Sequence, residues 1–122
     1  MMSRIMITAF VLFMVLPAFG HELEKGPHGG RVLDTGQVHV ELVAKDSLVE
    51  VYLTDGSNKA VAALGYKGIA ILLISGKSQR IVLEPAGDNL LTGKTTVALT
   101  SPPKGAVLLT APDGKTSQAK FD

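Results

Sequence analysis

The stretch GQVHVELVA, residues 36–44, alternates apolar and polar side chains with a period of two residues. In an extended chain this period places the apolar members on one face, and these are Val38, Val40 and Leu42. His39 and Glu41 share the opposite face, where their Cα atoms lie about 6.7 Å apart. The pattern predicts a half-buried β-strand over residues 38–44, with an imidazole and a carboxylate on its polar side.

Beyond this strand the chain continues as short β-prone runs separated by turn residues, and no run of ten or more residues follows a helical period. Asp34-Thr35-Gly36 suits a hairpin turn that joins a strand at residues 31–33 to the strand at 38–44. Further strands are expected at residues 49–54, 69–75, 79–84, 95–100, 106–111 and 116–121, with a weak edge segment at 59–63.

The run at residues 69–75 is continuously apolar, which is typical of a strand buried on both faces. Regular turn signals between short strands favour a sandwich or a small barrel. The expected fold is therefore all-β: a single small β-sandwich or barrel-like domain of seven to eight short strands over residues 31–122.

The N-terminal segment has the pattern of a secretion signal. Arg4 precedes a 12-residue apolar run, residues 5–16, which is interrupted only by Thr8 and is shorter than the about 20 residues that a spanning helix needs. Ala18-Phe19-Gly20 provides small residues at the −3 and −1 positions of a cleavage site. These features predict a signal peptide at residues 1–20 and a flexible, histidine-containing segment at 21–30. The expected product is an exported periplasmic protein without a membrane span after cleavage.

Composition excludes several classes of function. The chain has 12 Lys and Arg against 11 Asp and Glu, and loss of Arg4 with the signal peptide would leave equal numbers of positive and negative side chains. A net charge near zero does not favour binding to nucleic acid. Absence of cysteine excludes a disulfide framework and a lipoprotein anchor. No nucleophile elbow and no phosphate-binding glycine loop occurs, so we do not expect an enzyme.

All three histidines of the chain, His21, His28 and His39, fall within one short stretch after the predicted signal. Glu41 lies in the same region, and imidazole with carboxylate is a ligand set that suits divalent copper, zinc, nickel or cobalt. The four methionines all precede the cleavage site, so soft monovalent metals are not favoured. The candidate metal ligands are His28, His39 and Glu41, with His21 as an additional one.

Each candidate also has a purely structural interpretation. His21 could belong to a disordered tail, or its imidazole and the new terminal amine could chelate Cu(II) after cleavage. His28 could be a turn residue bonded to a backbone carbonyl, next to glycines that serve only chain reversal. His39 and Glu41 could form the solvated face of an amphipathic strand. Tyr52 could cover the site or pack across strands.

Several motifs together suggest a family: His28-Gly29-Gly30, and the stretches at residues 36–43, 51–55, 84–90, 113–115 and 119–121. In these the chain resembles the N-terminal region of the adaptor (membrane fusion) subunits of heavy-metal RND efflux systems, and the small stand-alone exported proteins encoded with them. The resemblance implies an all-β domain that handles metal, with His28, His39 and Glu41 as ligand positions. The chain lacks the coiled-coil hairpin and lipoyl-like segments of the adaptors, which leaves an accessory role.

Two functions follow as hypotheses. The first is a periplasmic accessory protein that binds a divalent transition metal for buffering or delivery in a heavy-metal efflux or resistance system, with an efflux adaptor or another envelope protein as partner. The second is a metal-independent envelope protein–protein interaction module that docks through a sheet edge or the loop at Leu64-Gly65-Tyr66. A copper oxidoreductase is disfavoured because so short a chain offers little room for a substrate surface.

Overall fold

The computed structural model describes residues 22–99 and 103–122. The predicted signal peptide at residues 1–20 and the candidate ligand His21 lie outside the described residues. No helix capable of crossing a membrane occurs in the described ranges.

The described chain forms strands joined by turns and loops, which confirms the all-β expectation. The strands are β1 (Glu22–Lys25), β2 (Arg31–Asp34), β3 (His39–Thr54), β4 (Lys67–Ile74), β5 (Lys77–Pro85), β6 (Leu90–Leu99), β7 (Lys104–Thr110) and β8 (Thr116–Phe121). Every pairing between them is antiparallel, in the order β1-β2-β3-β6-β5-β4-β7-β8. Strand β1 comes from the segment at residues 21–30 that was expected to be flexible.

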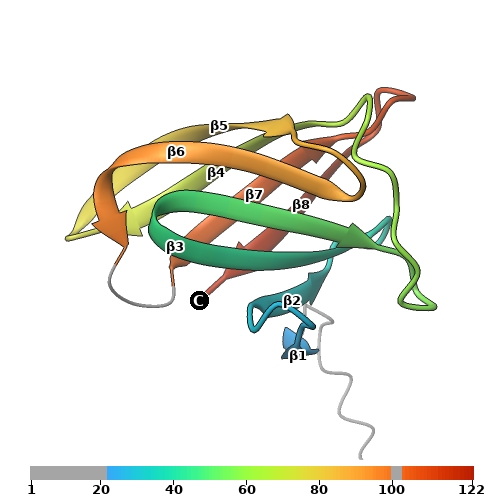
Figure 1. Ribbon diagram of the computed structural model, residues 1–122, viewed down its shortest axis with the longest axis horizontal. Helices are drawn as coiled ribbons and strands as arrows, with labels where there is room; N and C mark the ends of the chain where they lie inside the picture. The colour runs from blue at the N-terminus through green and yellow to red at the C-terminus, as the bar shows by residue number, and fades with distance from the viewer. Residues whose placement is uncertain (1–21, 100–102) are drawn as a thin grey trace, which may run out of the picture.

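The sheet curls into a nearly closed, barrel-like shape, so the barrel alternative describes it better than two separate sheets (Figure 1). Strand β8 comes round beside β2. At this seam the guanidinium carbon of Arg31 lies 5.6 Å from the ring centroid of Phe121. A cation over an aromatic face is attractive, so this contact helps to hold the two ends of the sheet together.

Strand β3 differs from the sequence-based expectation of two strands at residues 38–44 and 49–54. It is one strand of 16 residues, and Figure 1 shows that it doubles back on itself. Asp46 has a positive φ of 50°, and the register with β6 shifts between Asp46 and Leu48. The first half pairs with β2 and the second half with β6. The chain therefore reverses without a separate loop.

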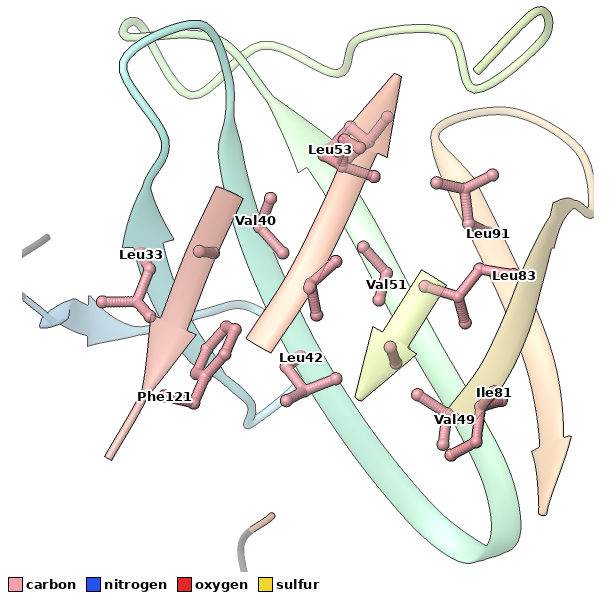
Figure 2. Close-up of a cluster of buried hydrophobic side chains, with 14 of the residues drawn as sticks. Leu33, Val40, Leu42, Val49, Val51, Leu53, Ile81, Leu83, Leu91 and Phe121 are labelled. Atoms are coloured by element: carbon pink, nitrogen blue, oxygen red, sulfur yellow. The ribbon is translucent and has the colours of Figure 1, made fainter. Parts of the chain in front are cut away.

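The barrel interior is apolar, and alternate residues of each strand supply it. Figure 2 labels Leu33, Val40, Leu42, Val49, Val51, Leu53, Ile81, Leu83, Leu91 and Phe121 among the buried side chains. Each of these side chains is at most 3% exposed. Burial of one such side chain stabilises the fold by about 1.5–3 kcal/mol. Since both halves of β3 turn alternate residues into this core, their other residues, Glu41 and Tyr52 among them, point out of the barrel.

Strand β4 corrects one expectation, because the apolar run at residues 69–75 is not buried on both faces. Ala70 and Leu72 are fully buried in the core, whereas Ile71 is 36% and Leu73 53% exposed. An antiparallel barrel lines only its interior, and nothing in the described chain covers the outer side of β4. The expected edge segment at residues 59–63 contributes only a single bridge, between Thr54 and Ala60.

The hairpin expected at Asp34-Thr35-Gly36 is confirmed. Gly36 adopts a positive φ of 88°, and its backbone N–H donates to Oδ1 of Asp34 at 2.7 Å. The Thr35 N–H donates to the carbonyl of Val38 at 2.9 Å. This turn sets the register that places Leu33 opposite Val40 in the pair of strands leading to Glu41.

Candidate functional site

Glu41 is the central group of the site, and it is only 4% exposed although it points out of the barrel. Its Oε2 accepts hydrogen bonds from the backbone N–H groups of His28 and Gly30, each at 2.9 Å. Its Oε1 lies 2.8 Å from Nδ1 of His28. Three contacts to one carboxylate offset the cost of burying it, since a buried charge without partners is strongly unfavourable.

The loop over Glu41, residues 26–30, is shaped by its glycines. The Gly26 N–H donates to the Gly30 carbonyl at 2.8 Å, and Gly29 has a positive φ of 79°. A Cβ at Gly26 would collide with the Glu41 carboxylate, and one at Gly30 would collide with the carbonyl oxygen of Leu42. The HGG motif is therefore required here for close approach to β3 as well as for chain reversal.

His28 presents an oriented imidazole at the surface of this loop. Its side chain is 42% exposed, and its ring stacks on Tyr52 with centroids 3.6 Å apart and planes within 5° of parallel. An ionised carboxylate only accepts hydrogen bonds, so the contact with Glu41 requires the proton on Nδ1. In the neutral ring, Nε2 then carries a free lone pair.

Tyr52 is held in turn by a second buried carboxylate. Its hydroxyl donates to Oε2 of Glu50 at 3.0 Å, and Nζ of Lys45 lies 3.6 Å from the other oxygen of Glu50. Burial raises the pKa of Tyr52 above its ordinary value of 10.0, and the hydrogen bond to Glu50 and the charges of Glu50 and Glu41 raise it further. The phenol therefore stays neutral and serves as a fixed platform for the imidazole.

His39 shares the outward face of β3 with Glu41, but its ion-pair partner is Asp34 and not a member of this cluster. Its Nε2 is 3.8 Å from Oδ2 of Asp34, and its side chain is 17% exposed. It lines a pocket of about 510 Å³ with Lys25, Gly26, Pro27, Val32, Glu41, Thr54 and Asn58.

The structure thus brings His28 and Glu41 together and leaves His39 beside Asp34. Within residues 22–99 and 103–122, no three or more His, Asp or Glu side chains are grouped so that they could hold one metal ion. Their roles as metal ligands stay predictions. Sequence reasoning raised Tyr52 as a cover for the site or a packing residue, but it did not anticipate the contribution of Glu50 or Gly26. The signal for Glu50 was a charged residue two positions before a tyrosine on one strand face.

Comparison of the chain with models of protein families, with curated proteins and with solved structures finds no match.

Proposed function

We propose that this chain is an exported, periplasmic accessory protein of a heavy-metal efflux or resistance system, and that it binds a divalent transition ion through Nε2 of His28. The observation that carries the proposal is the 2.8 Å contact between Nδ1 of His28 and Oε1 of Glu41. Histidines that ligate metals usually donate their other ring N–H to a carboxylate or carbonyl, which fixes the tautomer and makes the free nitrogen a better ligand.

The surroundings of His28 support a ligand prepared in advance. The stack on Tyr52 and the bond to Glu41 restrict both side-chain torsions, so little rotamer entropy remains to be lost on binding. At the same time the side chain is 42% exposed, so an ion can reach it from solvent. A histidine that served only to fill a turn would need neither restriction.

Glu41 acts in this proposal as an orienting group and not as a ligand. Direct coordination would require it to give up hydrogen bonds to the backbone of His28 and Gly30, and a bond to a charged group contributes about 1.5–3 kcal/mol. This differs from the ligand role that the sequence suggested.

The remaining ligands would come from His21, from His39 or from solvent. Imidazole donors accept copper, zinc, nickel and cobalt, and solution affinity should follow the Irving–Williams order whichever ion is the cargo. A site with few protein ligands keeps positions open for exchange, which suits buffering or delivery.

The test is titration of the mature protein with Zn(II) and Cu(II), followed by calorimetry and by mass spectrometry under native conditions. His28→Ala should weaken binding at least about tenfold, and Glu41→Gln by about 10–100-fold because the imidazole loses its orientation. Glu84→Gln, at an exposed carboxylate of β5, is the matched control and should bind as the parent protein does. Unchanged affinity in His28→Ala would overturn the proposal. A nitrogen NMR spectrum would also overturn it if it showed that the neutral imidazole of His28 carries its proton on Nε2 and not on Nδ1.

A further inference from the structure

A second surface lies on the outer side of β4, β5 and β7, away from His28. Six apolar side chains project from it, and we call them the outer patch: Ile69, Ile71, Leu73, Val82, Ala106 and Leu108. The strand register makes them neighbours. Ile69 is paired with Val82 on one side and Leu108 on the other, and Ile71 is paired with Ala106.

The outer patch is open to solvent. Val82 is 60%, Leu73 53% and Ile71 36% exposed, and the other three members are half-buried. Contiguous exposed apolar side chains with a polar rim mark interaction surfaces more often than scattered single ones do. Leaving three branched aliphatic side chains exposed on two neighbouring strands is unfavourable unless something covers them.

The rim of the outer patch is cationic at one end. Arg80 is paired with Ile71, Lys104 with Leu73, and Lys120 with Ala106 across the antiparallel register. All three cations are exposed, and none forms an ion pair with another described residue. Lys104 and Lys120 line a shallow groove of about 580 Å³, with Ile71 and Leu73 also in its wall. Asp122 is the acidic residue that lines this groove.

We infer that the outer patch is a docking surface for a protein segment that presents apolar side chains flanked by acidic ones. The cationic rim is complementary to carboxylates, and the aliphatic centre can bury an apolar face, as in protein interfaces with an apolar core and a polar rim. A second copy of the chain fits less well, because a two-fold contact would bring the same cations together. A bilayer also fits less well, because the patch holds no aromatic side chain to anchor at a lipid interface.

The probe is a short synthetic peptide that alternates leucine and aspartate, and a leucine–lysine peptide of the same length is its control. NMR of the labelled full chain should show shifts from the acidic peptide confined to β4, β5, β7 and β8, and no shifts from the basic one. Lys104→Glu with Lys120→Glu should weaken binding at least about tenfold, and more at low salt. Lys59→Glu with Lys115→Glu, two exposed lysines outside the patch, should change it less than about twofold.

A matched pair of variants tests what the apolar side chains contribute to peptide binding. Leu73→Ser should weaken binding of the acidic peptide several-fold. Leu64→Ser should leave binding unchanged, because Leu64 is 83% exposed but lies outside the outer patch. His28→Ala should bind the peptide as the parent does, so this test is independent of metal binding. The inference is overturned by equal binding of both peptides, by shifts outside the named strands, by flotation with phosphatidylglycerol vesicles, or by self-association that Leu73→Ser abolishes.

Discussion

The outer faces of β3 and β4 carry opposite kinds of side chain. On β3 the outward residues include carboxylates that are nearly buried, Glu41 at 4% and Glu50 at 8% exposed. On β4 the outward residues are aliphatic and uncovered, with Leu73 at 53% exposed. Both faces depart from the usual arrangement, in which charged side chains are exposed and apolar side chains are buried. The outer face of β3 buries charge, and the outer face of β4 exposes apolar surface.

The difference lies in what covers each face. The loop at residues 26–30 closes over β3 and supplies backbone donors, so a charge can be buried there with its hydrogen bonds satisfied. No segment of the described chain closes over β4. These two departures on the exterior of the barrel are the features on which the two proposed binding surfaces rest.

The comparison is sharpest at two neighbouring leucines of β4. Leu72→Ala should lower the free energy of unfolding by about 2–5 kcal/mol, because Leu72 is fully buried and its removal leaves a cavity. Leu73→Ala should change it by less than about 0.5 kcal/mol, because that side chain contributes little to the core. Urea denaturation of both variants measures the two values. Similar losses would mean that the outer face of β4 is covered after all.

A smaller effect is expected where the loop meets β3. Gly30→Ala should cost about 1–3 kcal/mol of unfolding free energy, because the added Cβ collides with the carbonyl oxygen of Leu42. Gly56→Ala is the matched control: a Cβ there meets nothing within 4 Å. Thermal unfolding followed by circular dichroism compares them. If both variants unfold like the parent, the loop does not lie against β3 as described.

The smallest effect should come from the hydroxyl of Tyr52. Its pKa is raised in the folded protein, so the stability it contributes is fully present below pH 10.0, the ordinary value, and is lost as pH rises through the folded pKa. Tyr52→Phe should remove this alkaline component at a cost of about 1 kcal/mol at neutral pH. Ultraviolet titration of the phenolate measures the pKa directly. Glu50→Gln should lower that pKa, and an unchanged value would contradict the role given to Glu50.

Much of the fold could be predicted from local pattern. The alternation in residues 36–44, the hairpin at Asp34-Thr35-Gly36 and the bounds of β8 agree with the structure, because periodicity and turn chemistry act over a few residues. The single doubled-back strand β3 and the exposed side of β4 were not predicted. Both depend on which segments cover which face, and a run of apolar letters does not encode that.

The candidate site divides in the same way. His28 and Glu41 were singled out by residue type, yet 13 positions separate them along the chain, and their contact depends on the path of the loop. Glu41 pairs with His28 and not with His39. The backbone N–H groups of residues 28 and 30 also donate to the Glu41 carboxylate, and they hold it against the loop that carries His28.

The sequence by itself determined that this chain is all-β and that Val38, Val40 and Leu42 face the core, because both follow from a two-residue period and from turn residues. Only the tertiary structure decided that Glu41 is buried beneath a glycine loop, that Tyr52 supports His28, and that the cations Arg80, Lys104 and Lys120 rim one apolar face. The physical reason is that burial and pairing depend on contacts between strands distant in the chain, and closure of the barrel sets those contacts.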